Sequence, residues 1–539
     1  MTSNITNPIL PGFNPDPSIC RVGNDYYIAT STFEWFPGVQ IHHSTDLIHW
    51  RLISRPLNRP DLLDMRGNPD SCGIWAPCLS WDDGMFYLVY TDVKRHSGDA
   101  KDTHNYITRC ATIDGEWQTP VYVNSSGFDP SLFHDDDGRR WFLNMLWDYR
   151  PDKPSFGGIL LQELDRDHLT PIGPVHNIFA GSPLGMVEGP HLYKRNGYYY
   201  LLTAEGGTEY EHACTLARSK KLTGPYELHP RQHLMTARFD PTSPLQRVGH
   251  GDLVETPDGD TYLVHLCSRP LANRGRSPLG RETAIQKLQW RDDDWPWPMS
   301  ESLAPQVAVP APHSTASSPG RSTEQHYLFD TATLPIDFQW LRTPYPSQLF
   351  SLTERPGFLR LYGRESLGSL FNSALVARRQ QSHCFTASTT VDFQPKHFQQ
   401  MAGLACYYNS RKYHYLFVSY DDEIGRYLDV ASCLADPNGH GHYPLKGQRI
   451  PLPVQGPIRL RVEVRFEHWY GYWATADGDW QALPLKLDHS ILSDEAGTGA
   501  GNNFTGAFVG MAAQDLAGTA LPADFSEFIY REDKPLGKL

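Results

Sequence analysis

Three acidic residues stand in short motifs of the chain. Asp16 lies between two prolines in NPDPS, Asp129 lies in the similar motif FDPS, and Glu188 lies in VEGP. Asn, Asp and Pro are ordinary turn residues, so turn formation alone would explain the first two motifs. Two carboxyl groups that flank a glycosidic bond can hydrolyse it, one as a protonated acid and the other as a base or nucleophile. This chemistry requires a fold that brings the acids together.

A repeat in the N-terminal part of the chain predicts such a fold. Five segments combine a turn with an aromatic strand, and each predicts a β-hairpin. They are GNDYYIATS (23–31), DDGMFYLVYTD (82–92), DDGRRWFLNMLWD (136–148), RNGYYYLLTAEGG (195–207) and PDGDTYLVHLC (257–267). Repeats of about 60 residues made of short antiparallel strands are typical of β-propeller blades. We therefore expect an all-β, five-bladed β-propeller over residues 1–303.

Equivalent positions in the five repeats hold residues that can do chemistry. Counting nine positions back from the second turn residue of each hairpin gives Asp16, Trp75, Asp129, Glu188 and His250. In a propeller these positions ring one end of the central channel. Packing alone predicts small or apolar residues there, whereas clustered carboxylates raise each other's pKa and are typical of functional sites. The third carboxylate would keep the acid protonated near neutrality.

Composition excludes several classes of function. The 539 residues carry a formal net charge of −13, which argues against a nucleic-acid partner. No stretch approaches the ~20 apolar residues of a membrane span, and the N-terminus has no secretory signal pattern. The nine cysteines form no CxxC pair or metal signature and are expected to be buried free thiols. We therefore expect a cytoplasmic enzyme.

A second domain is predicted after the propeller. Residues 304–325 are rich in Pro and Ser and predict a linker. Residues 326–539 contain new strands, and in residues 458–466 apolar side chains alternate with charged ones. This pattern predicts an antiparallel β-sandwich.

Seven motifs together resemble glycoside hydrolase family 43. They are GFNPDPS, STFEWFPGVQIHHS, GNPDSCGIWAP, GFDPSLFHDD, EGPHLY, TAEGGT and PLGRETAIQK. The chain is most similar to the β-xylosidase branch, which has an added C-terminal domain. The resemblance implies an inverting mechanism in which Asp16 is the general base, Glu188 is the general acid, and Asp129 tunes the pKa of the acid and orients it. It also implies exo-acting release of xylose from xylo-oligosaccharides.

The resemblance extends to the residues that bind the sugar. Arg281 of PLGRET matches an arginine that hydrogen-bonds sugar hydroxyls, although alone it would suggest a surface ion pair. Phe33, Trp75 and Trp147 match aromatic walls of the pocket, with core packing as the alternative. Phe504 of the sandwich is expected to close the pocket or, alternatively, to pack in the sandwich core.

Other residues receive structural interpretations. His250 is predicted to lie in the substrate-binding site, although a lone histidine is more often a hydrogen-bonded structural residue. A third interpretation, a ligand of a channel cation such as calcium, has no other named ligand and fits poorly because calcium prefers many oxygen ligands. We otherwise expect no metal and no required cofactor. Trp35 and Phe36 are expected to pack. Cys78, where many relatives have Asp, is expected to be an inert buried thiol. The resemblance also implies a homodimer or homotetramer.

Three alternative functions remain. An α-L-arabinofuranosidase of the same family is the first, because the two sugars present similar hydroxyl layouts. A β-fructosidase also joins a five-bladed propeller to a sandwich, but its NDPNG and EC motifs are absent from this sequence. A non-catalytic sugar-binding propeller would not need clustered carboxylates.

Overall fold

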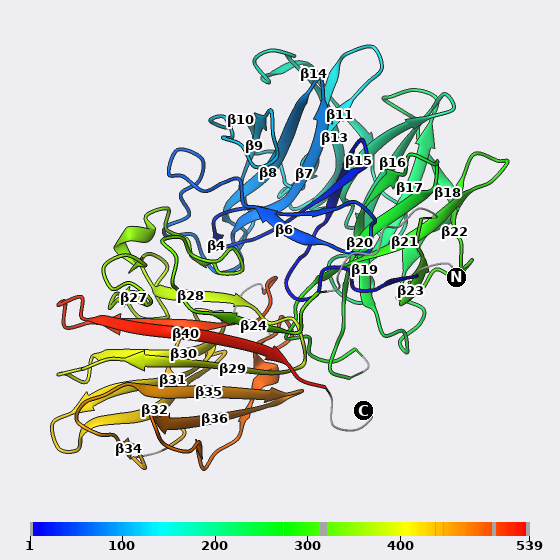
Figure 1. Cartoon of the computed structure of the whole chain (residues 1–539). Helices are drawn as coiled ribbons and strands as arrows, with labels where there is room; N and C mark the ends of the chain where they lie inside the picture. Colours follow the sequence, from blue (N-terminus) through cyan, green and yellow to red (C-terminus); the bar gives the residue numbers. More distant parts are fainter. Residues whose placement is uncertain are drawn as a thin grey trace.

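The computed structural model describes residues 4–272, 274–312, 321–436, 438–445, 447–497 and 503–534. In these residues the chain is all-β, with strands β1–β40 and two short 3-10 helices, η1 (Pro346–Gln348) and η2 (His489–Ile491). Figure 1 shows a propeller and a sandwich in contact with each other. The predicted fold class is confirmed.

The propeller has five blades, each an antiparallel sheet of four strands in chain order. The first two blades are β2 (Ser18–Val22), β3 (Asp25–Thr30), β5 (Gln40–Ser44) and β6 (Arg51–Ser54), then β7 (Gly73–Asp82), β8 (Met85–Arg95), β9 (Asp102–Cys110) and β10 (Val121–Asn124). The third blade is β11 (Ser131–His134), β12 (Arg140–Trp147), β13 (Phe156–Leu164) and β14 (Pro171–Phe179).

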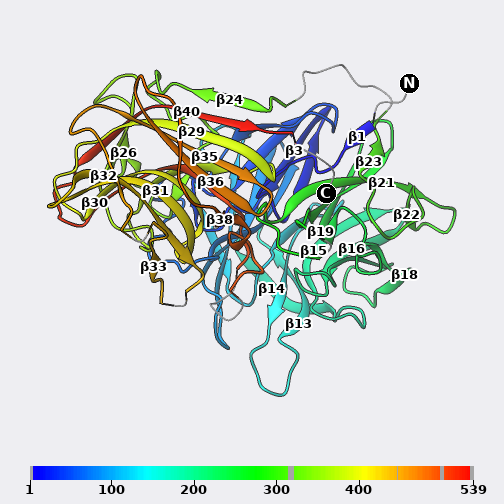
Figure 2. The same cartoon turned by 90° about the horizontal axis from the view of Figure 1, so that it is seen from below.

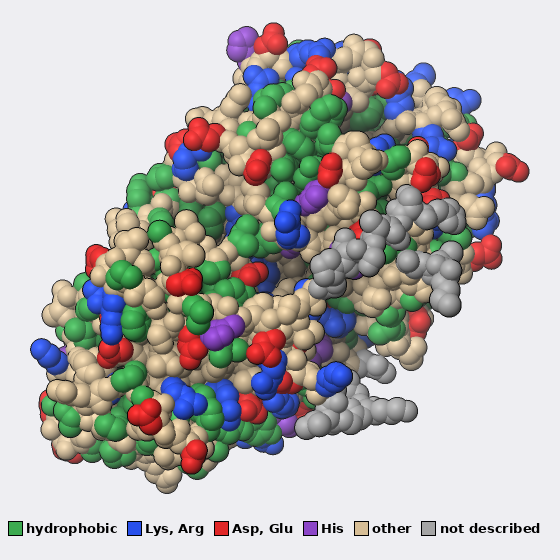
Figure 3. Space-filling view, in the orientation of Figure 1, with side chains coloured by type: hydrophobic (Ala, Val, Ile, Leu, Met, Phe, Trp, Pro, Cys, Tyr) green, Lys and Arg blue, Asp and Glu red, His purple; other side chains and the backbone are tan. Residues whose placement is uncertain are grey.

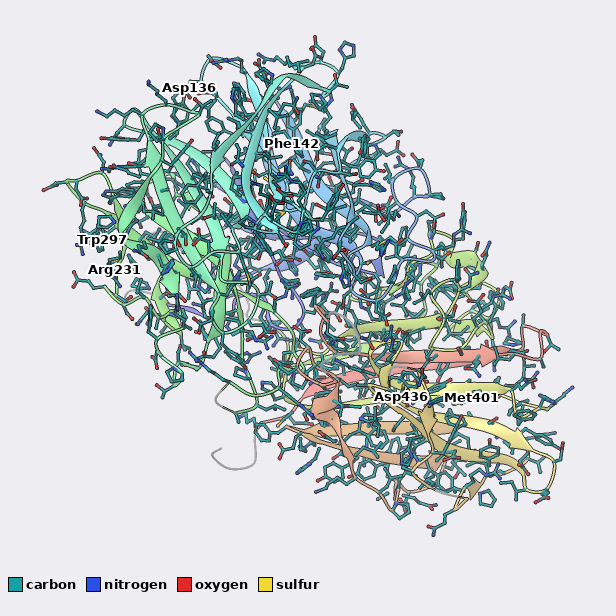
Figure 4. All side chains as sticks on the ribbon, turned by 180° about the vertical axis from the view of Figure 1, so that it is seen from behind. Asp136, Phe142, Arg231, Trp297, Met401 and Asp436 are labelled. Atoms are coloured by element: carbon teal, nitrogen blue, oxygen red, sulfur yellow. The ribbon has the colours of Figure 1, made fainter. Side chains whose placement is uncertain are left out.

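The last two blades complete the ring. They are β15 (Glu188–Arg195), β16 (Tyr198–Glu205), β17 (Ala213–Ser219) and β18 (Glu227–Thr236), then β19 (Gln246–Glu255), β20 (Thr261–Ser268), β21 (Glu282–Trp290) and β22 (Pro296–Pro298). The first strand of each blade contacts the first strands of both neighbouring blades, so these five strands surround the channel. At the outer edge, Arg231 of β18 lies over the ring of Trp297 of β22, 5.6 Å from its centroid (Figure 4).

The five predicted hairpins are present, with one correction in the first. The turn between β2 and β3 is Gly23–Asn24, because Val22 pairs with Asp25. The nine-position count that leads to Asp16 implies Asn24–Asp25 as this turn, and the structure corrects it. Gly23 has a φ of 62°, a left-handed conformation that glycine adopts without strain, and this moves the turn one residue back.

The ends of the propeller chain meet in a small additional sheet. Strand β1 (Asn4–Thr6) pairs with β23 (Ala308–Pro310), and Figure 2 shows the two side by side near the N-terminus. The side chain of Asn7 donates to the backbone oxygen of Ile285, at 2.8 Å. The predicted linker 304–325 thus contains a strand that pairs with the propeller; its residues 313–320 lie outside the described residues.

The C-terminal domain consists of two packed antiparallel sheets. One contains β26 (Phe350–Ser351), β27 (Leu359–Tyr362), β40 (Pro522–Glu532), β29 (Cys384–Asp392), β35 (Ile458–Arg465), β36 (His468–Thr475), β37 (Gln481–Ala482), β24 (Glu324–Tyr327) and β38 (Leu487–Asp488). The other contains β28 (Ala374–Arg379), β39 (Phe508–Asp515), β30 (Gln400–Asn409), β31 (Lys412–Asp421), β32 (Gly425–Leu434), β33 (Gly441–His442) and β34 (Ile450–Pro451). The apolar residues of β35 alternate into the core, as predicted.

Strand pairing crosses the boundary between the two domains. Strand β4 (Trp35–Phe36) of the propeller segment pairs with β25 (Trp340–Leu341). The ring of Trp35 stacks on Phe508, with 3.7 Å between centroids. The prediction that Trp35 and Phe36 pack is therefore confirmed, and the contact they form is with the sandwich.

Charged residues are mixed on the visible surface. Figure 3 shows acidic and basic side chains interspersed over this face of both domains. No helix among the described residues is long and apolar enough to cross a membrane. All nine cysteines are buried and free, as predicted.

Candidate active site

One cavity of about 240 Å³ lies at an end of the propeller channel and reaches the sandwich. All nine residues predicted for the site line it. They are Asp16, Phe33, Trp75, Asp129, Trp147, Glu188, His250, Arg281 and Phe504. The five residues that the spacing singled out therefore share one cavity, although in the first blade the count of nine starts at Asp25, which is the first residue of β3 and not a turn residue.

The backbone has a left-handed conformation at or beside these five residues, within the first strand of a blade or just before it begins. In three blades the channel-facing residue found by the count of nine has a positive φ itself, and in the other two blades the residue after it has one. These are Asp16 (55°), Asp129 (55°), His250 (44°), Ala76 (34°) and Gly189 (56°). Such backbone is strained for residues other than glycine and is concentrated at functional sites. In β7, β15 and β19 the pairing register also shifts at this place, which interrupts the regular alternation of side chains.

Asp16 is held by two hydrogen bonds. Ser31 Oγ donates to its Oδ2 at 2.7 Å, and Arg281 Nη1 donates to its Oδ1 at 2.7 Å. Ser31 Oγ in turn accepts from the backbone N–H of Ala76, at 2.7 Å. Asp16 and Arg281 are both buried, so this ion pair fixes the carboxylate in a water-poor environment.

Asp129 and Glu188 are the two carboxyl groups of the site whose pKa values are raised. Burial, and next the negative charge of Asp16, raise the pKa of Asp129 to about 8. Burial, followed by the charges of Asp129 and Asp16, raises the pKa of Glu188 well above its usual range. A carboxyl group with a raised pKa can remain protonated near neutrality and serve as an acid.

His250 lies beside these acids. Its Nδ1 is 3.8 Å from Asp129 Oδ2, and burial lowers the pKa of His250 to about 4. The imidazole is therefore neutral over most of the pH range in which glycosidases work. Among the described residues no group of three or more His, Cys, Asp or Glu could hold a metal ion. The calcium hypothesis thus gains no further ligand here.

Aromatic rings form one wall of the cavity. The ring centroid of Trp75 is 5.7 Å from that of Phe33, 5.5 Å from that of Phe128 and 5.7 Å from that of Phe504. Ser71 joins two of these residues, because its backbone oxygen accepts from Trp75 Nε1 and its Oγ accepts from the N–H of Phe504. The wall is therefore built by both domains.

Trp147 continues this wall through Phe128 and contacts residues that the sequence reasoning missed. Lys101 Nζ is 4.2 Å from the centroid of its ring, and Trp147 Nε1 donates to the backbone oxygen of Asp99 at 2.7 Å. The missed lining residues are His96, Lys101, Phe128, Phe156, Gly207 and Thr208. Phe128 and the pair Gly207–Thr208 lie in the motifs GFDPS and TAEGGT, which could have identified them; the loop with His96 and Lys101 carries no sequence signal.

Cys78 lies at the opposite end of the channel from this site. It is buried and lines a second cavity of about 550 Å³ together with Asp252 and Tyr193. Burial, and next the charge of Asp252, raise the pKa of the Cys78 thiol to about 12. A thiol in this state is unreactive, in agreement with the prediction.

Two family models cover most of the chain. Residues 5–296 match "Glycosyl hydrolases family 43", and residues 326–531 match "Beta xylosidase C-terminal Concanavalin A-like domain". The first match spans the five blades that carry the three acids. The chain belongs to glycoside hydrolase family 43.

Full-length relatives agree with this assignment. "Xylosidase/arabinosidase 43B" of Humicola insolens is 54% identical over 98% of this chain and 97% of its own length. "Beta-xylosidase" of Bacillus subtilis is 50% identical over 98% of this chain and 99% of its own length. The crystal structure of xylan beta-1,4-xylosidase from Bacillus halodurans superposes with a TM-score of 0.95 at 50% identity, covering 98% of this chain and all of that one. This family 43 protein is therefore a glycoside hydrolase, and not a non-catalytic propeller or a β-fructosidase.

Proposed function

We propose that this family 43 enzyme is an inverting, exo-acting β-1,4-xylosidase that releases xylose from the non-reducing end of xylo-oligosaccharides. The observation that carries the proposal is the cavity that holds Asp16, Asp129 and Glu188 and is bounded by Phe504 of the sandwich. A small cavity bounded by both domains suits one terminal sugar unit better than a chain that passes through. The relatives from Bacillus subtilis and Bacillus halodurans, both named as xylosidases, support the substrate.

The geometry supports a different role for each acid. Asp16, paired with Arg281, is the carboxylate that accepts a proton from the attacking water. Glu188, whose pKa is raised by burial and by the charges of Asp129 and Asp16, donates its proton to the leaving oxygen. Asp129 raises the pKa of Glu188 and orients it. The aromatic wall around Trp75 offers a planar apolar surface for the C–H face of the sugar.

Product analysis tests this proposal. With xylotetraose, we expect xylose and xylotriose as the first products, whereas early xylobiose alone would contradict the exo mode. Proton NMR of the first-formed sugar should show α-xylose, as an inverting enzyme requires. β-Xylose as the first product would contradict inversion.

A second candidate function is α-L-arabinofuranosidase activity in the same pocket. The relative from Humicola insolens is named for both sugars, which supports this candidate. Parallel assays with nitrophenyl β-xyloside and nitrophenyl α-L-arabinofuranoside decide between them. A kcat/KM ratio that favours the arabinoside would reverse the proposed main activity.

Three further predictions accompany the proposal. The mechanism uses only side chains and water, so we propose that the reaction needs no cofactor and that full activity survives chelator treatment. A cytoplasmic location agrees with nine buried free thiols. Assembly into a dimer or tetramer stays a prediction, to be measured by light scattering.

A further inference from the structure

A cavity of about 190 Å³ lies between the propeller and the sandwich and shares no residue with the lining of the active site. Three buried arginines contribute to its wall: Arg55 from the propeller, and Arg378 and Arg379 from β28 of the sandwich. Arg321 also lines it, and together with Trp50 it lines a wider neighbouring cleft of about 760 Å³. The cavity therefore adjoins a larger surface cleft.

None of the three buried arginines forms an ion pair with a carboxylate among the described residues. Arg55 donates to the side chain of Gln40 and to backbone oxygens of the sandwich, including that of Phe338 at 3.2 Å. Arg379 donates to the backbone oxygen of Phe13 at 2.5 Å and to Gln339 Oε1 at 2.6 Å. Neutral oxygens thus accept these hydrogen bonds, and the opposite charge that acts on both Arg55 and Arg379 is that of the single carboxylate Asp337.

Arg378 also donates hydrogen bonds to neutral oxygens, all of them in the C-terminal domain. Its Nη1 donates to Gln325 Oε1 and Tyr327 Oη, each at 2.9 Å, and its Nη2 donates to Gln381 Oε1 at 2.6 Å. Its Nε has no hydrogen-bond partner in the part of the chain that the structure describes. The same holds for Nη2 of Arg379, whose side chain is 5% exposed. Two buried donors therefore have no acceptor in the described protein.

The acidic residues near these cations are too few to neutralise them. Asp337 is the one acidic residue among those described that line the cavity, and it accepts a hydrogen bond from Tyr327. Burial lowers the pKa of Arg55 to about 9 and, with the charge of Arg55, lowers that of Arg379 well below its usual range. Burial and the charges of Arg379 and Arg55 also lower the pKa of His42 on the same wall. The local charge balance is clearly positive.

We propose that this cavity is a binding site for a small oxyanion, such as phosphate, sulfate or a carboxylate group. An isolated buried charge is costly, and a bound anion supplies the missing counterion. Guanidinium groups present forked donors that match the oxygens of such anions. Arg55 reaches from the propeller to the sandwich, and Arg379 reaches from the sandwich to the propeller. An anion held between them therefore strengthens the docking of the two domains.

Thermal unfolding at constant ionic strength tests the proposal. Sulfate that replaces chloride should raise the Tm of the wild-type protein by about 1–3 °C, with saturation at millimolar concentration. Gln381→Glu places a carboxylate beside Arg378 without a change in side-chain size, because Gln381 Oε1 already accepts from Arg378. This variant should be stable in chloride and should lose the response to sulfate.

A matched control separates this effect from a general change in charge. Gln118 Oε1 accepts from Arg109 Nε at 3.1 Å on the exposed surface of the propeller, so Gln118→Glu makes the same change elsewhere. It should retain the full sulfate response. If wild type shows no preference for sulfate over chloride, or if Gln381→Glu responds as wild type does, the proposal is wrong.

A crystallographic measurement on the wild-type protein does not depend on folding of the variant. Crystals soaked in selenate should show an anomalous peak in this cavity, beside Arg55, Arg378 and Arg379. Gln325→Glu is the second variant, because Gln325 Oε1 accepts from Arg378 Nη1. It should remove the peak. Selenate density at other surface sites only, with none in the cavity, would overturn the proposal.

Discussion

Arg281 forms a buried ion pair with Asp16, with 2.7 Å between Nη1 and Oδ1. The same guanidinium donates from Nη2 to the backbone oxygen of Phe504, at 3.0 Å. One side chain of blade five therefore connects the proposed base, which precedes the first strand of blade one, to the loop of the sandwich that bounds the cavity. The sandwich loop thus helps to hold the arginine that is paired with the proposed base.

Replacement of Arg281 by Met should lower kcat/KM by about 100-fold or more, because the base loses its orientation and its counterion. The kcat/KM of Arg281→Lys should lie between those of wild type and Arg281→Met, since one ammonium cannot make both hydrogen bonds in the same directions. Steady-state kinetics with nitrophenyl β-xyloside measure the effect. Arg139→Met, which removes an exposed pair with Asp137, is the control and should leave activity unchanged. Near-normal kinetics of Arg281→Met would refute the role of this pair.

Asp129→Asn should move the alkaline limb of the kcat/KM profile to lower pH. Burial and then the charge of Asp129 raise the pKa of Glu188, so loss of that charge lets the acid lose its proton earlier. The pH profile of the variant measures the shift. Asp137→Asn, in the exposed turn of the same blade, serves as the control. A limb that stays in place would show that Asp129 does not tune the acid.

The same substitution should change the pH dependence of stability. The pKa of Asp129 is raised to about 8 in the folded protein, so its contribution to stability is present below the unfolded value of ~3.9 and is lost as pH rises through 8. Asn does not titrate, and the variant should therefore unfold at higher denaturant concentration than wild type at pH 8. The advantage should shrink toward pH 4. A constant difference at both pH values would argue against the raised pKa.

Much of this site could be predicted from sequence because it is built on a repeat. Asp16, Asp129 and Glu188 occupy equivalent positions in blades one, three and four, so spacing alone indicated that they meet. The spacing did not indicate the left-handed backbone, with a φ of 55°, that Asp16 and Asp129 adopt. Phe504 was identified only through family resemblance.

Contacts between distant segments were beyond sequence reasoning. The pair Asp16–Arg281 joins residues 265 positions apart, and no periodic pattern connects them. Lys101 lies in a loop without a motif, and its position over Trp147 follows from how that loop folds onto blade three. Such contacts are set by tertiary packing, which local patterns do not encode.

The loss of activity in Glu188→Ala should depend on the leaving group of the substrate, because some leaving groups need a proton from the acid and others do not. Nitrophenolate leaves without protonation, whereas the hydroxyl of a second xylose needs a proton, so the loss should be several orders of magnitude with xylobiose and smaller with nitrophenyl xyloside. Asp16→Ala should lose activity with both substrates, because both need an activated water. Equal losses for Glu188→Ala with both substrates would contradict its assignment as the acid.

Phe504→Ala should open the cavity on its sandwich side. Phe504 contacts the ring of Trp75 at 5.7 Å between centroids and that of His96 at 5.8 Å, so its removal deletes one wall of the sugar pocket. We expect KM for xylobiose to rise about 10-fold or more with a smaller change in kcat, since binding surface is lost while the acids stay in place. Phe398→Ala, at an exposed position of the same domain, should leave both constants unchanged. A normal KM in Phe504→Ala would show that the sandwich does not take part in substrate binding.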